Sequence, residues 1–189
     1  MDYMFISLKT LNSLYINFNS KNVETMEHMF SELTSMKNLT AKLDTHNVKS
    51  MDFMFAFSKS LKSLNLTSFD TQNVETMKAM FENCESLEDL DVSSFNTTNV
   101  KSFAFMFSSC NSMKVLDLSS FDTTNALSVF NMFAFCNILH RLDISGFHLS
   151  KNERFLPNYT ENPGVIIVNK DIEEYVKEQL RGNWMIIVK

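Results

Sequence analysis

Hydrophobic side chains return along the chain with a period of about 25 residues. The pair Met-Phe marks each unit, with its methionine at Met4, Met29, Met54, Met80, Met106 and Met132. A column of asparagines keeps the same spacing, at Asn22, Asn47, Asn73, Asn99 and Asn125. This self-similarity predicts a solenoid, because a unit of this length cannot bury its own apolar side and must stack on its neighbours.

Each unit combines two local patterns, as residues 55–80 illustrate. Apolar residues alternate with polar ones over part of 61–69, which predicts a short strand. Over 74–81 they recur at three and four residues, which is typical of one face of a short helix or 3₁₀ segment. Asn73 opens this second part and is a preferred helix N-cap residue. We therefore expect about six coils, each a strand followed by a helical turn.

Stacking of coils at the usual strand spacing of about 4.8 Å would turn each repeated position into a ladder. We expect a phenylalanine ladder through the core, formed by Phe30, Phe55, Phe81, Phe107 and Phe133. The asparagine column should form a buried ladder that satisfies backbone groups at the corners. This packing explains why Phe 18 and Met 13 are so abundant, while Gly 3 and Pro 2 leave the turns to Asn, Asp, Ser and Thr.

A different pattern follows Phe147. Residues 148–163 contain both prolines and predict a linker. An apolar strand over 165–168, a helix capped by Asn169 and a last strand over 184–188 predict a C-terminal β-α-β cap. The chain thus divides into a solenoid over 1–147 and a linker with cap over 148–189. The first coil offers no comparable cap, so a homodimer through that open end is one interpretation.

Three motifs recur with specific residues: Leu-Asp-Val-Ser-Ser-Phe at 90–95, its equivalent at 116–121, and Asn-Val-x-x-Met-x-x-Met-Phe-x-x-Cys at 73–84. Over residues 4 to about 147 they closely resemble the BspA-like leucine-rich-repeat family of bacterial surface proteins. The resemblance implies an α/β repeat fold, a right-handed leucine-rich-repeat-like solenoid. It also implies a non-enzymatic adhesion module, displayed at the cell surface or secreted, that binds a protein or glycan partner of a host or neighbouring cell.

Charge and motif content narrow the function. The net charge is −5 and the chain holds three arginines, so it lacks the basic face that nucleic acid requires. No apolar run approaches the ~18 residues of a membrane span, so we expect no membrane insertion. The absence of H-E-x-x-H, G-x-S-x-G and glycine-rich phosphate loops argues against an enzyme, a metal or a cofactor. Without a visible secretion signal, a cytoplasmic interaction or inhibitor protein of the immunity type is the alternative.

An acidic column is the first candidate binding site. Asp91, Asp117 and Asp143 occupy equivalent positions, with Asn65 in the preceding coil. They alternate with buried strand residues and should therefore point outward. Stacked carboxylates can bind a cation or a basic partner. The alternative is that they only hydrate the strand face and bond to the neighbouring serines.

Apolar residues at outward positions form the second candidate site. Phe53, Phe105 and Phe130, with Leu127, occupy positions of the helical turns that should face solvent. A contiguous apolar patch there would be a protein interface. The alternative is that the turns rotate and bury these rings.

Three cysteines, Cys84, Cys110 and Cys136, share one column and lie one repeat apart. Three thiols cannot all pair, and parallel inward side chains suit disulfide geometry poorly. We expect buried, reduced thiols that fill the core.

Overall fold

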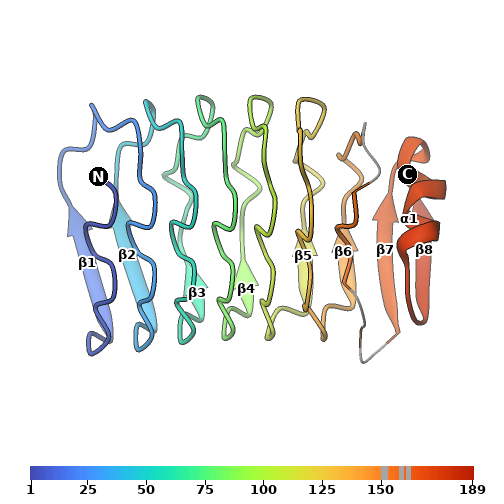
Figure 1. The fold of residues 1–189 in the computed structure, drawn as a ribbon, viewed down its shortest axis with the longest axis horizontal. Coiled ribbons are helices and arrows are strands. Elements are labelled where there is room, and N and C mark those ends of the chain that lie inside the picture. The colour runs from blue at the N-terminus through green and yellow to red at the C-terminus, as the bar shows by residue number, and fades with distance from the viewer. Residues whose placement is uncertain (150–152, 158–159, 161–162) are drawn as a thin grey trace.

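The computed structural model is a β-solenoid of about six coils that stack along the long axis of the molecule (Figure 1). The structure describes residues 1–149, 153–157, 160 and 163–189. Each coil contributes one short strand and returns through a turn segment on the other side of the core. In the described part of the chain the only α-helix lies near the C-terminus.

All strand pairs that the structure describes are parallel. One four-stranded sheet holds, in order, β1 (Ser13–Asn17), β2 (Asn38–Lys42), β3 (Ser63–Leu64) and β4 (Asp89–Leu90). The other holds β5 (Val115–Asp117), β6 (Arg141–Asp143), β7 (Gly164–Val168) and β8 (Trp184–Val188). Leu14, Leu39, Leu64 and Leu90 pair in register. Equivalent residues of successive repeats therefore lie directly beside one another, as the repeat predicts.

In the residues that the structure describes, the turn side of the coils is not helical, so the prediction of a helical turn is wrong. Alternate backbone N–H groups donate to the next coil: the Phe55 N–H reaches the Met80 carbonyl at 2.9 Å, and the Phe81 N–H reaches the Met106 carbonyl at 2.9 Å. The N–H groups between them close local turns, as the Glu82 N–H does with the Ala79 carbonyl at 3.1 Å. Ala79 and Asn83 have positive φ angles of 53° and 57°, and the equivalent residues of the other coils do the same. A left-handed residue interrupts a right-handed helix. Two tight turns thus return apolar residues to the core at the three- and four-residue spacing that otherwise indicates a helix.

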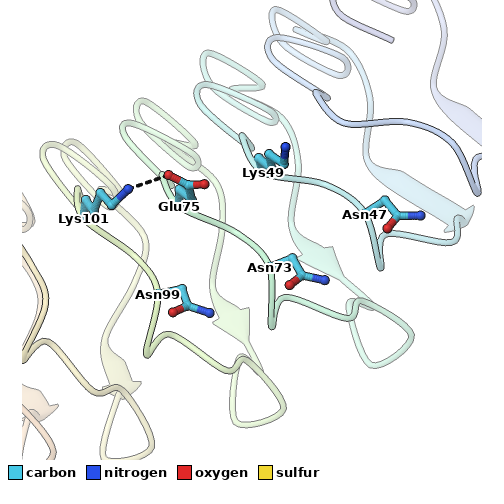
Figure 2. Close-up of a pocket in the computed structure, with 6 residues that line it drawn as sticks. All are labelled: Asn47, Lys49, Asn73, Glu75, Asn99 and Lys101. Carbon is cyan, nitrogen blue, oxygen red and sulfur yellow. Dashed lines mark hydrogen bonds and ion pairs between the residues drawn. The ribbon is translucent and has the colours of Figure 1, made fainter.

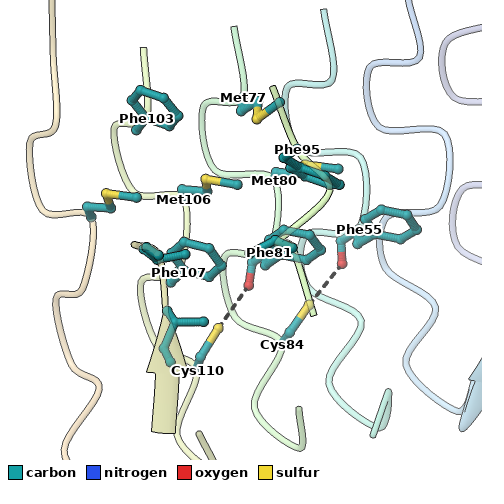
Figure 3. Close-up of a cluster of buried hydrophobic side chains, with 14 of the residues drawn as sticks. Phe55, Met77, Met80, Phe81, Cys84, Phe95, Phe103, Met106, Phe107 and Cys110 are labelled. Atoms are coloured by element: carbon teal, nitrogen blue, oxygen red, sulfur yellow. Dashed lines mark hydrogen bonds between the residues drawn. The ribbon is translucent and has the colours of Figure 1, made fainter. Parts of the chain in front are cut away.

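The predicted phenylalanine ladder is confirmed and fills the core (Figure 3). Its neighbouring ring centroids are 5.5 to 5.8 Å apart and their planes lie within 11° of parallel. The cysteines lie beside it, and the Cys84 thiol donates to the Phe55 carbonyl at 3.2 Å. Burial raises the pKa of Cys84 to about 12. All three thiols are buried and unpaired with one another, as predicted.

The asparagine ladder exists but is exposed, so the prediction of a buried column is wrong. After Asn22, the side-chain amides of the ladder cross to the preceding coil: Asn73 Nδ2 donates to the His46 carbonyl and Asn99 Nδ2 donates to the Gln72 carbonyl, both at 2.7 Å. Asn47 and Asn125 do the same with the carbonyls of Lys21 and Thr98. These residues bridge coils at a solvent-facing corner instead of capping a helix.

The predicted β-α-β cap is present. Strand β7 is followed by a 3₁₀ turn, η1 (Lys170–Ile172), by helix α1 (Glu173–Gln179) and by the parallel strand β8. The Asn169 side chain accepts from the N–H groups of Asp171 and Ile172, which begins the helical segment. Because β7 pairs with β6, the cap continues the stack of strands.

The predicted linker over 148–163 lies partly outside the described residues, which omit 150–152, 158–159 and 161–162. Its described part continues the turn side of the stack. The Phe155 ring lies 6.2 Å from the Phe133 ring, and the Phe133 N–H donates to the Phe155 carbonyl at 2.9 Å. Glu153 accepts from the Ser128 hydroxyl at 2.8 Å. One more rung of the core is therefore built from residues that lack the Met-Phe motif.

Candidate functional site

The outward column on the strand face is a series of side-chain turns. Asn65 Oδ1 accepts from the Thr67 N–H at 3.1 Å, and Asp91 Oδ1 accepts from the Ser93 N–H at 2.9 Å. Asp117 Oδ1 accepts in the same way from the Ser119 N–H at 2.9 Å. Bonds from the Ser93 hydroxyl and N–H lower the pKa of Asp91. One oxygen of each side chain thus closes a local turn, which is the bonding to serine that the sequence left as an alternative.

Asp143 departs from this column, and the expectation that it points into solvent is wrong. Its residue surface is only 5% exposed. Its Oδ2 accepts from the ammonium of Lys189 at 2.6 Å, while its Oδ1 closes the turn with Ser145. Burial alone would raise the pKa of Asp143, but the bonds from Lys189 and Ser145 outweigh it and lower that pKa. The exposed acidic column therefore consists of Asp91 and Asp117.

The turn face brings together only two of the three predicted aromatic residues. The Phe105 and Phe130 rings meet edge to face, with centroids 5.5 Å apart and planes at 83°. Phe130 is 43% exposed, and Phe105 is half-buried. We call these two rings the aromatic pair. Leu127, in the same coil as Phe130, is also exposed.

Phe53 belongs to a different group near the N-terminus. Its ring stacks on His28 with centroids 4.6 Å apart, and His28 stacks on Tyr3 at 4.7 Å. The Lys78 ammonium lies 5.6 Å from the centre of the Phe53 ring. The sequence identified Phe53 as outward but did not reveal this stack, because Tyr3, His28 and Phe53 are three different residue types and do not form a visible repeat.

An exposed corner groove, which the sequence analysis did not single out, follows the asparagine ladder (Figure 2). It is lined by Asn47, Asn73, Asn99, Lys49, Glu75 and Lys101. Its charges alternate in sign from coil to coil, and the Lys101 ammonium lies 2.5 Å from the Glu75 carboxylate. That hydrogen bond and the charge of Lys101 lower the pKa of Glu75. The alternation of sign from one repeat to the next is the signal that could have found this groove. The lining holds two lysines and one glutamate, and Glu24, 3.8 Å from Lys49, balances the remaining charge, which leaves little field for a charged ligand.

Metal binding and membrane spanning depend on the side-chain groups and the helix of the described residues. Among the residues that the structure describes, no group of three or more His, Cys, Asp and Glu side chains could hold a metal ion. In that same part of the chain no helix is long and apolar enough to cross a membrane.

The comparisons with known proteins agree with the repeat architecture. The family model described as Mycoplasma protein of unknown function, DUF285, matches residues 1–65 and 56–162. No curated protein and no solved structure matches the chain. The matched ranges cover most of the solenoid and more than half of the chain. The chain, a β-solenoid with repeats of about 25 residues, therefore belongs to the DUF285 family.

Proposed function

We propose that the chain is a non-enzymatic binding module that recognises a protein partner at a cell surface. The resemblance of its motifs to BspA-like leucine-rich-repeat surface proteins supports this location and a right-handed, leucine-rich-repeat-like coil. A glycan is the second kind of partner that the resemblance implies. The aromatic rings of Phe105 and Phe130, the second of them exposed, favour a protein, because aromatic side chains are enriched in protein interfaces.

The aromatic pair is the observation that carries the proposal. Its two rings belong to adjacent coils, and the Phe105 N–H donates to the Phe130 carbonyl at 2.9 Å, which fixes their separation. Phe130 remains 43% exposed although the core beside it is closely filled. Exposed aromatic side chains are enriched at the centres of protein interfaces, where they bury a large area at a small cost in conformational entropy.

The rigid scaffold favours binding at this surface. Backbone bonds between coils flank both rings, so their backbone positions are set before a partner arrives. A surface that is ordered in advance loses little conformational entropy on docking. The partner would then need to be complementary to a fixed edge-to-face pair.

The double variant Phe105→Ser with Phe130→Ser tests the proposal. Met185→Ser is the matched control, because Met185 is an apolar residue of strand β8 that is 64% exposed. Both variants are compared with the wild type in capture of surface proteins from host and bacterial cells, after circular dichroism has confirmed folding. We expect the aromatic variant to lose a captured protein that the control retains. Identical capture by all three would contradict a role for the aromatic pair.

Location is tested separately by antibody labelling of intact cells that produce the full protein. Labelling without permeabilisation is the expected result. Labelling only after permeabilisation would favour the cytoplasmic interaction protein instead.

A further inference from the structure

Lys189, at the end of the described residues, donates a hydrogen bond to Asp143, the third aspartate of the predicted acidic column. The Lys189 ammonium lies 2.6 Å from Asp143 Oδ2 and 3.4 Å from the Ser145 hydroxyl. Lys189 is 46 residues away in sequence, and its N–H donates to the Val168 carbonyl at 2.9 Å. The Asp-x-Ser turn at 143–145 is therefore seen binding a primary ammonium group that is not part of the column.

The same Asp-x-Ser motif occurs twice more, at 91–93 and 117–119. The turn at Asp91 has nearly identical geometry: its Oδ1 accepts from the Ser93 N–H at 2.9 Å and from the Ser93 hydroxyl at 2.7 Å, against 3.0 and 2.7 Å at Asp143. Asp91 and Asp117 are exposed and line a shallow groove with Ser93 and Ser119. The oxygen equivalent to the one that binds Lys189 is not needed for either turn.

We infer that Asp91 and Asp117 bind lysine side chains of an extended, lysine-rich segment in a protein partner, in the way that Asp143 binds Lys189. This inference rests on the proposed function for the existence of a protein partner, but it uses a different face of the solenoid. Lysines on one face of an extended segment lie about 7 Å apart. Their flexible stems can reach two carboxylates that are one coil apart.

The turn chemistry favours lysine over the other cations. An arginine fork binds best to both oxygens of a carboxylate, and here one oxygen already accepts from the serine. A calcium ion needs six to eight oxygen ligands. An ammonium group needs one acceptor oxygen and a neighbouring hydroxyl, which is the pair of contacts that Lys189 makes.

Asn65 shows that asparagine can replace aspartate in this turn without breaking it. Asn65 occupies the same column and closes the same turn through its Oδ1, with bonds of 3.1 Å to the Thr67 N–H and 2.7 Å to the Thr67 hydroxyl. Replacing Asp91 and Asp117 by asparagine therefore removes the charge and keeps the turn. The double variant Glu24→Gln with Glu75→Gln removes the same charge from beside the corner groove and is the matched control.

The experiment is a titration of the isotope-labelled protein with a pentalysine peptide at low salt, followed by the amide signals of Ser93 and Ser119. We expect these signals to move, and expect Asp91→Asn with Asp117→Asn to weaken binding at least fivefold while the control changes it less than twofold. Fully Nε-acetylated pentalysine should not bind, and pentaarginine should bind less tightly than pentalysine.

Lys189→Gln provides an independent test, because it should free Asp143 and add the Ser145 amide to the signals that move. Equal weakening by both double variants, or pentalysine shifts centred away from the strand face, would overturn the inference. Those outcomes leave the proposed function intact if the aromatic variant still loses its captured protein. A lysine response without such a loss would retain this inference and contradict the role of the aromatic pair.

Discussion

Replacing Phe81 by alanine should remove the centre of the phenylalanine ladder and destabilise the protein by about 4 kcal/mol. Phe81 is fully buried between two parallel rings, at 5.6 Å from Phe55 and 5.5 Å from Phe107. Burial of a phenylalanine side chain removes roughly 200 Å² from water. At about 25 cal/mol per Å² this corresponds to about 5 kcal/mol, of which alanine retains a small part. The two lost ring contacts and a partly collapsed cavity keep the expected cost within the range of about 3–5 kcal/mol for such substitutions.

The same change at the end of the ladder should cost less. Phe5 is only partly buried and stacks on one member of the ladder, Phe30, at 5.6 Å. We expect Phe5→Ala to cost about 1–2 kcal/mol, since it loses one stacked ring and a tilted contact with Phe18 at 6.3 Å, and leaves a space that solvent can enter. Phe81→Leu preserves most of the apolar surface and should cost about 1–2 kcal/mol.

The assay is urea unfolding followed by circular dichroism, with the free energy of unfolding extrapolated to water for each variant. A solenoid is stabilised mainly by contacts between neighbouring coils, so a central lesion weakens two interfaces and a terminal lesion weakens one. A lower urea slope for Phe81→Ala than for the wild type would show that the two halves unfold separately. If Phe5→Ala were as damaging as Phe81→Ala, or if the central variant lost under about 1 kcal/mol, stacking along the ladder would not be the main source of stability.

Three further predictions concern single contacts. Asp143→Asn should cost about 1–2 kcal/mol at pH 7 because it breaks the ion pair with Lys189. The pKa of Asp143 is lowered in the folded state, so this stabilisation is present above the unfolded-state pKa and is lost as pH falls through the folded-state pKa. In urea unfolding, the difference in free energy of unfolding between wild type and Asp143→Asn should therefore shrink between pH 7 and pH 2. In the same assay, Ala79→Gly should lower the free energy of unfolding by about 1 kcal/mol less than Ala56→Gly does. Both alanines are fully buried, but of the two only Ala79 has a positive φ angle, which glycine adopts without strain. Equal losses would refute backbone strain at these turns. At pH 8, Cys84 should react with a thiol reagent at least about 100-fold more slowly in the native protein than in guanidinium. Its pKa is about 12 and its side chain is buried, so little reactive thiolate is present or accessible. Rapid labelling of the native protein would contradict this burial.

The turn side of the coil marks the limit of local pattern analysis. Apolar residues at three- and four-residue spacing identify which side chains face the core, and Met77, Met80 and Phe81 do face it. They do not identify where the backbone N–H groups bond. A helix and a pair of tight turns can present the same inward residues, and only the neighbouring coil, one repeat away, supplies the carbonyls that favour the turns.

The candidate sites show the same limit. Alternation along the strand placed Asp91 and Asp117 on the outside, and both are exposed. It placed Asp143 there as well, but Lys189 covers it from 46 residues away. Phe53 is similarly half-buried by partners in the two neighbouring coils, His28 and Lys78. No local pattern records which residue of another coil will approach.

The sequence by itself determined the repeat period, the stacking of equivalent positions, the aromatic core and the C-terminal β-α-β unit. These features follow from hydrophobic burial, which depends on the local order of apolar and polar residues. The tertiary structure decided the conformation of the turn side, the exposure of the asparagine ladder and the pairing of Asp143 with Lys189. These depend on hydrogen bonds and charges between coils, whose partners are set only once the coils are stacked.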